Sequence, residues 1–110
     1  MKITQKESNG TTIFDVNGDI DINSSPDMRE TFENLVNKKI MKIIVNLKGA
    51  SYIDSSGLAT LVEMLKKTRS YGGKLRLSNL APKVRSLFEI TKLEKLFDIF
   101  DTEEEAAANF

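Results

Sequence analysis

Two kinds of hydrophobic pattern alternate along the chain. Short stretches in which apolar and β-branched residues run together or alternate predict strands, and apolar residues three or four positions apart predict helices. Strand patterns occupy residues 3–6, 11–16, 42–47, 74–78 and 96–100. Four helical patterns are present. The first follows Ser25, the second runs from about residues 54–57 to 71–73, and the others occupy residues 82–91 and 102–110. The element order β-β-α-β-α-β-α-β-α predicts an α/β domain.

Local signals support several of these elements. The Asn-Gly pair at residues 9–10 is typical of a β-hairpin turn. Ser25 before Pro26 predicts a helix that begins with Ser25 as its N-cap, and Gly72 is suited to ending the following helix. The apolar run at residues 43–45 predicts a central strand that is buried on both faces.

The helical connections also predict the topology. Strands at residues 42–47, 74–78 and 97–100 are joined through helices, so we expect them to be parallel with right-handed crossovers. Together with the hairpin they predict one domain, residues 1–110, with a mixed four- to five-stranded sheet and about four helices. Ligands of such sheets bind beyond the carboxyl ends of the strands, which is where the loop at residues 48–57 is expected.

Composition excludes several kinds of chemistry. The 110 residues are 40% hydrophobic and carry 16 basic and 16 acidic side chains, a formal net charge of zero. This balance argues against nucleic acid as a direct partner. The absence of histidine and cysteine excludes Ser-His-Asp triads, thiol nucleophiles and thiolate zinc sites. A metal would then need oxygen ligands only, and residues 15–21 resemble a calcium loop but have the glycine at the wrong position. We expect no enzymatic activity, no cofactor and no metal.

Location and exposed charge can also be predicted. The first ten residues are polar and contain no apolar signal segment, and no apolar run is long enough to cross a membrane. We expect a cytoplasmic protein without a membrane partner. Lys83 and Arg85 are expected on the solvent-exposed side of their helix, with a specific role in anion binding as the alternative.

The segment at residues 50–58 carries the most chemical information. Asp54 is suited to capping the helix that follows, and Ser55 and Ser56 then lie in its first turn, where backbone N–H groups and the helix dipole favour an anion. Gly57 is expected to leave this helix end accessible to another protein. Most serines in such positions are only part of a cap, and a catalytic serine would need a base that the sequence does not place beside it.

The order and spacing of several motifs resemble the STAS domain family, and specifically the bacterial anti-sigma factor antagonists. The motifs lie at residues 18–21, 43–47, 52–58, 72–73, 84–88 and 93–97. The similarity extends over nearly the whole chain. One departure is Ala59, where many family members have glycine.

The resemblance implies a phosphorylation switch. The serine that follows the family's aspartate, here Ser55, would be phosphorylated by an anti-sigma factor that is a serine kinase. The unphosphorylated chain would bind this kinase and free the sigma factor, phosphorylation would end the binding, and a PP2C-type phosphatase would reverse it. We expect the chain to be a monomer or weak dimer. The expected partner-binding residues are Asp19, Asp21, Asp54, Ser56 and Gly57.

Two other functions remain open at this stage. A STAS domain can instead serve as a scaffold in a stress-sensing or lipid-transport assembly, although the length of the chain argues against a transporter tail. A two-component receiver domain would also be α/β, with Asp54 as its phosphate acceptor. Receivers need an acidic pair after the first strand to hold magnesium, and residues 6–8 do not provide one.

Overall fold

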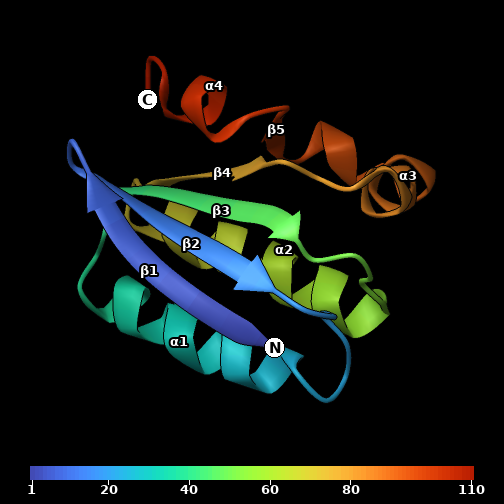
Figure 1. The fold of residues 1–110 in the computed structure, drawn as a ribbon. Coiled ribbons are helices and arrows are strands. Elements are labelled where there is room, and N and C mark those ends of the chain that lie inside the picture. The colour runs from blue at the N-terminus through green and yellow to red at the C-terminus, as the bar shows by residue number, and fades with distance from the viewer.

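The five strands form one mixed sheet in which the spatial order follows the chain, β1-β2-β3-β4-β5 (Figure 1). The computed structural model describes residues 1–110. β1 and β2 are antiparallel, and the pairs β2–β3, β3–β4 and β4–β5 are parallel. The strands are β1 (Lys2–Ser8), β2 (Thr11–Asn17), β3 (Lys42–Gly49), β4 (Lys74–Ser78) and β5 (Asp98–Phe100). The predicted α/β class and mixed sheet are confirmed.

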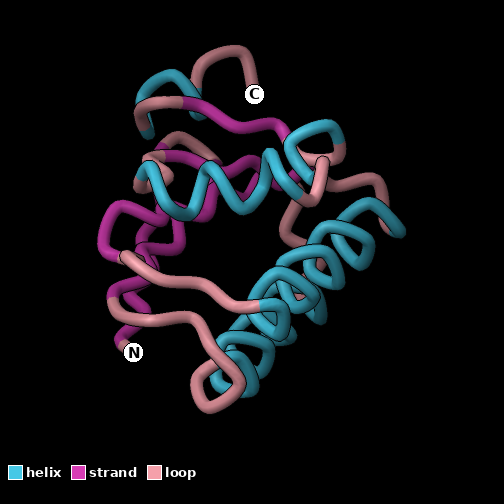
Figure 2. The backbone as a smooth tube through the Cα atoms, turned by 90° about the vertical axis from the view of Figure 1, so that its right-hand side faces the viewer, coloured by secondary structure: helices cyan, strands magenta, loops and turns pink.

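Helices cover both faces of this sheet unequally. α1 and α2 lie side by side on one face, while α4 lies on the other (Figures 1 and 2). α3 lies near the edge where β3 ends (Figure 1). None of the helices combines the length and apolar composition that a bilayer-spanning segment needs. The helices are α1 (Ser25–Asn37), α2 (Ser55–Ser70), α3 (Pro82–Ile90) and α4 (Glu103–Ala107), with a 3₁₀ turn at Leu93–Lys95.

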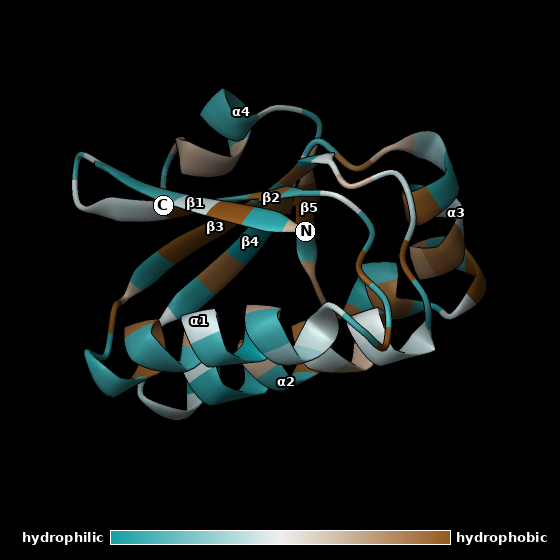
Figure 3. Cartoon of the chain, turned by 60° about the horizontal axis from the view of Figure 1, so that its bottom comes forward, coloured by the Kyte–Doolittle hydropathy of each residue, from teal (hydrophilic) through white to brown (hydrophobic).

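The main core fills the space between the sheet and the α1–α2 layer. Phe14 of β2 packs edge-on against Phe32 of α1, with ring centroids 6.1 Å apart. The helices turn their hydrophilic residues away from the sheet (Figure 3). On the other sheet face, Ile13 and Ile44 form a small cluster with Ala106 of α4. β3 is therefore covered on both faces, as its apolar run predicts.

The first hairpin has the expected two-residue turn. Ser8 pairs with Thr11, and Asn9 and Gly10 between them have φ angles of 52° and 80°. Asparagine and glycine tolerate these left-handed conformations better than other residues, and such turns match the twist of a hairpin.

The predicted N-cap of α1 is wrong by one residue. The helix already includes Ser25, and Ser24 occupies the cap position without a capping bond from its side chain. The Ser24 hydroxyl instead accepts the Asp21 N–H at 2.9 Å and donates to the Asp19 carbonyl at 2.7 Å. The loop before the helix thus uses the hydroxyl that a cap would need.

The last strand and helix are shorter than predicted. β5 starts at Asp98 because Leu96 and Phe97 continue the turn at Leu93–Lys95, and their N–H groups donate to the Leu93 carbonyl. Thr102 caps α4 by accepting the Glu105 N–H, but the helix ends at Ala107, before the predicted end at residue 110. Beyond it, the Arg76 guanidinium lies 4.3 Å from the centroid of the Phe110 ring. Arg76 also donates to carbonyls of the last turn, which holds the end of the chain against the sheet.

Candidate functional site

The loops that follow β2 and β3 meet beyond the carboxyl end of the sheet. Ile20 and Ile53 form an isolated parallel bridge between them. The Ile20 N–H donates to the Tyr52 carbonyl at 2.9 Å, and the Asp54 N–H donates to the Ile20 carbonyl at 3.1 Å. This bridge fixes Asp54 directly before α2, so the loop at residues 48–57 lies where the topology predicts.

Asp54 connects the two loops through its carboxylate. One oxygen, Oδ1, accepts the Ser56 hydroxyl at 2.6 Å and the Gly57 N–H at 3.1 Å. The other, Oδ2, accepts the Ile22 N–H from the β2–α1 loop at 3.2 Å. The bond from Ser56, followed by that from Gly57, lowers the pKa of this carboxyl below its ordinary value. Asp54 is thus the N-cap of α2, as predicted, and also holds the β2–α1 loop.

The two serines of the first turn have different environments. The Ser56 hydroxyl is half-buried and is bonded to Asp54. Ser55 is exposed, and its hydroxyl forms no hydrogen bond within the chain. Of the two, Ser55 is therefore the hydroxyl that an external reagent can reach without breaking a bond.

The environment of Gly57 differs from the one predicted. It is buried, and a Cβ at this position would lie 2.7 Å from the Ile20 carbonyl oxygen and 2.7 Å from Cγ1 of Ile53. The absence of a side chain therefore allows the start of α2 to pack against the two bridged loops. The expectation that Gly57 leaves this helix end open to a partner is wrong.

Asp19 and Asp21, the two acidic residues of the β2–α1 loop, lie apart from Ser55. Asp21 is half-buried, and its carboxylate accepts the Asn23 and Ser24 N–H groups. Asp19 is exposed and forms no ion pair. Both line a separate shallow depression. The structure brings Asp54 and Ser56 to Ser55, whereas Asp19 and Asp21 lie further around the same end of the molecule.

A cleft of about 460 Å³ opens beside Ser55, between the β3–α2 loop and α3. The sequence analysis did not include the residues of α3 in this site, because α3 is distant from Ser55 in the chain. One signal was present: Ile90 lies off the apolar face formed by Val84 and Phe88. The cleft is lined by Ser51, Tyr52, Ile53, Asp54, Ser55, Lys83, Val84, Ser86, Leu87 and Ile90.

Exposed apolar side chains gather around this cleft. The chain has five exposed large hydrophobic residues. Two of them line the cleft itself: Tyr52, which is 52% exposed, and Ile90, which is 78% exposed. Ile22, 71% exposed, lies in the loop bonded to Asp54. Met1 and Met41 are the other two. Exposed large apolar side chains that gather in one place are typical of a protein-binding surface.

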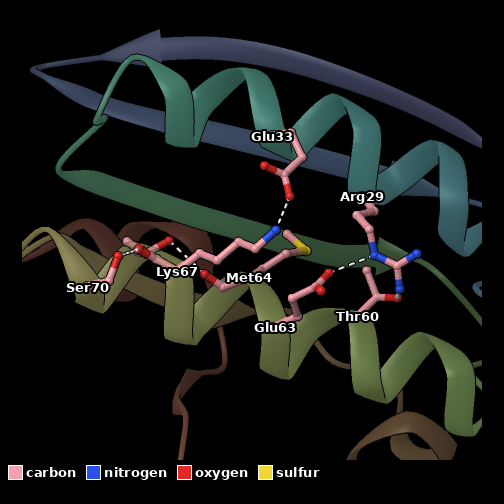
Figure 4. A network of polar contacts seen from close by, with 8 residues as sticks. Arg29, Glu33, Thr60, Glu63, Met64, Lys67 and Ser70 are labelled. Atoms are coloured by element: carbon pink, nitrogen blue, oxygen red, sulfur yellow. Dashed lines mark hydrogen bonds and ion pairs between the residues drawn. The ribbon is translucent and has the colours of Figure 1, made fainter.

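Ion pairs hold α2, which carries Ser55, against α1 (Figure 4). Arg29 of α1 donates to the Glu63 carboxylate at 2.7 Å and to the Thr60 hydroxyl at 3.2 Å. Lys67 of α2 pairs with Glu33, and the hydrogen bond that it donates to this carboxylate raises the pKa of the lysine. These contacts join the outer sides of the two helices.

Comparison with known protein families matches the STAS domain to residues 2–106. The chain belongs to the STAS domain family. Within the family, it is 32% identical to the anti-sigma-B factor antagonist of Bacillus subtilis over 99 residues, which cover 90% of each chain. The resemblance seen in the sequence is confirmed.

Solved structures show the same STAS fold. A candidate anti-sigma factor antagonist from Thermotoga maritima is 28% identical and gives a TM-score of 0.90, with 94% of this chain and 90% of that chain covered. The anti-sigma factor antagonist SpoIIAA gives a TM-score of 0.74 at 20% identity in its unphosphorylated form, with 96% of this chain and 94% of that chain covered. SpoIIAA of Bacillus has also been solved in its phosphorylated form.

Proposed function

We propose that this STAS domain is an anti-sigma factor antagonist whose binding is switched off by phosphorylation of Ser55. The unmodified chain binds an anti-sigma factor in the bacterial cytoplasm and so releases the sigma factor. The name of the Bacillus subtilis relative supports this proposal, because that protein matches over nine-tenths of both chains.

The observation that carries the proposal is the free hydroxyl of Ser55. It is exposed at the start of α2, next to a carboxylate that already has its own hydrogen-bond donors. A serine kinase can reach it without unfolding the helix. In the transfer, the Ser55 Oγ–phosphorus bond forms, the bond to the leaving ADP oxygen breaks, and the serine proton passes to a base of the kinase.

The surroundings of Ser55 explain how one phosphate ends binding. The group adds about −1.5 to −2 charges at neutral pH, next to the carboxylate of Asp54. A partner that covers the apolar residues Ile22, Tyr52 and Ile90 would have to remove water from this charge. Burying an uncompensated charge costs several kcal/mol, and about 1.4 kcal/mol changes affinity tenfold. No change of fold is needed.

The typical area of a protein interface indicates which residues around Ser55 a partner would cover. A stable interface covers about 800 Å² on each protein, so a kinase seated over Ser55 also covers the residues around it. Asp54 and Ser56 lie below that surface and shape it, while the exposed Asp19 is a contact for a basic residue of the partner. Gly57 contributes through packing. A PP2C-type phosphatase resets the switch by hydrolysing the phosphoserine.

The proposal is tested with the serine-kinase anti-sigma factors encoded in the same genome. Each is incubated with the purified chain and ATP, and intact mass and peptide mass spectrometry locate any phosphate. We expect one phosphate on Ser55, lost in Ser55→Ala. Ser51→Ala is the matched control, because Ser51 is also exposed and lines the same cleft.

Two results would contradict the proposal. One is phosphate on Ser51 or Ser56 in place of Ser55. The other is the absence of phosphate both in these reactions and on the chain isolated from its host under varied growth conditions. The domain would then be a STAS scaffold whose binding is not controlled by a kinase.

A further inference from the structure

We propose that Lys83 holds the phosphate of phosphorylated Ser55, so that the modified side chain bridges the cleft between α2 and α3. This inference rests on the proposed function for the presence of the phosphate. It adds a residue of α3 to the switch and gives the phosphorylated state a contact that the unmodified state lacks.

The first argument is the position of Lys83. It is the second residue of α3 and lines the same cleft of about 460 Å³ as Ser55, which opens α2. Both residues are exposed. A phosphate on Ser55 extends into the space that the two side chains share, and the flexible four-carbon stem of lysine lets its ammonium group follow.

The second argument is that Lys83 is unpaired. Its ammonium group has no carboxylate within 4.0 Å and forms no hydrogen bond in the unmodified chain. The other basic residue of this helix, Arg85, is engaged with Asp101 at 3.1 Å. Lys83 is thus the single cation that lines the cleft, and no existing ion pair has to break before it binds a phosphate.

The third argument is that the phosphate needs a counter-charge at this position. Asp54, the neighbour of Ser55, is the one acidic residue lining the cleft. Hydrogen bonds from Ser56, Gly57 and Ile22 hold its carboxylate in place, and it forms no ion pair with Lys83. A phosphate there meets a fixed negative charge, and apolar side chains in the walls strengthen both its repulsion from Asp54 and its attraction to a lysine.

The bridge has a consequence for partner binding. With Lys83 drawn to the phosphate, the bridge occupies part of the cleft beside Tyr52 and Ile90. A partner side chain that enters this part of the cleft in the unmodified state then meets the bridge as well as the added charge.

The proposal is tested on protein that carries phosphoserine at position 55, installed during synthesis by genetic code expansion. Phosphorus NMR follows the second ionisation of the phosphate as the pH is varied. A neighbouring cation favours the dianion and lowers this pKa, which is ordinarily about 6. We expect Lys83→Gln to raise it by about 0.5 pH units or more. Lys83→Arg keeps the charge and should leave it low.

Lys66→Gln is the matched control. It removes the same charge from an exposed residue of α2, about 16 Å further along the helix axis. An unchanged phosphate pKa in Lys83→Gln, or an equal rise in both variants, overturns the proposal. Because the phosphate is installed without a kinase, the experiment does not depend on the proposed function. A chain never phosphorylated in its host would contradict that function but leave this measurement intact.

Discussion

At the scale of single residues, Asp54 and Gly57 shape the site that presents Ser55. The Asp54 carboxylate accepts bonds from α2 and from the β2–α1 loop. Gly57 lets the same helix end approach Ile20 and Ile53. Both residues therefore position the exposed hydroxyl through contacts within the chain.

Asp54 is expected to make stability depend on pH. The pKa of Asp54 is lower in the folded chain than in the unfolded one. Its contribution to the free energy of unfolding is therefore complete above the unfolded-state pKa and is lost as the pH falls through the folded-state pKa. Asp54→Asn keeps the shape but cannot titrate. In urea unfolding between about pH 5 and pH 3, the original chain should lose more stability than this variant. Parallel loss in both would contradict this role.

Gly57→Ala is expected to destabilise the fold by about 1–3 kcal/mol, because the added methyl group overlaps backbone and side-chain atoms. Thermal and urea unfolding measure the effect. Ser55→Ala, an exposed substitution in the same helical turn, is the control and should change stability much less. A Gly57→Ala variant as stable as the original would show that the two loops can move apart at little cost.

At the scale of elements, α2 is positioned from both sides, by the sheet and by α1. The Arg29–Glu63 pair lies on the outer side of the helices, where both side chains are partly exposed. We expect a double-mutant cycle with Arg29→Gln and Glu63→Gln to give a coupling of about 0.2–1 kcal/mol that weakens as salt is added. A larger, salt-independent coupling would mean that the pair is shielded from solvent.

α3 is expected to contribute to binding through Ile90. Ile90→Asp should leave stability nearly unchanged, since the side chain is 78% exposed, and should weaken binding of the anti-sigma factor about tenfold or more. Met41→Asp is the control: Met41 is also an exposed apolar residue, but it precedes β3, at the opposite end of the strand from Ser55. Titration calorimetry measures the affinity of the anti-sigma factor for both variants. Equal losses in both variants would argue against a surface centred on Ser55.

The sequence predicted features that depend on a few neighbouring residues. The turn at residues 9–10, the cap at Asp54 and the buried run at residues 43–45 were all confirmed. The cap of α1 was not predicted correctly, because the role of Ser24 depends on how the loop before it folds.

Features that depend on tertiary contacts were missed. Lys83 and Ile90 line the same cleft as Ser55 only because α3 folds back to the carboxyl end of β3, and the sequence did not place either residue beside that serine. Likewise, the end of α4 depends on Arg76, which lies far from it in the sequence. The roles of Asp19 and Asp21 in partner binding stay predictions.

At the scale of the whole molecule, one end of the sheet carries the proposed switch, while the rest of the fold holds it in place. The chain has a radius of gyration of 12.5 Å, close to the value of about 13 Å expected for a compact domain of this length. The loops, the start of α2 and α3 converge beyond β3 (Figure 1). A local change of charge at this end can therefore control binding without rearranging the core.

The most direct test of this account is the affinity of the anti-sigma factor for the two forms of the chain. Titration calorimetry compares the unmodified chain with the chain carrying phosphoserine at position 55, using the kinase that modifies Ser55 and no ATP. The account predicts binding weaker by about 100-fold or more after phosphorylation, with the fold unchanged. Equal affinities for the two forms would contradict the switch.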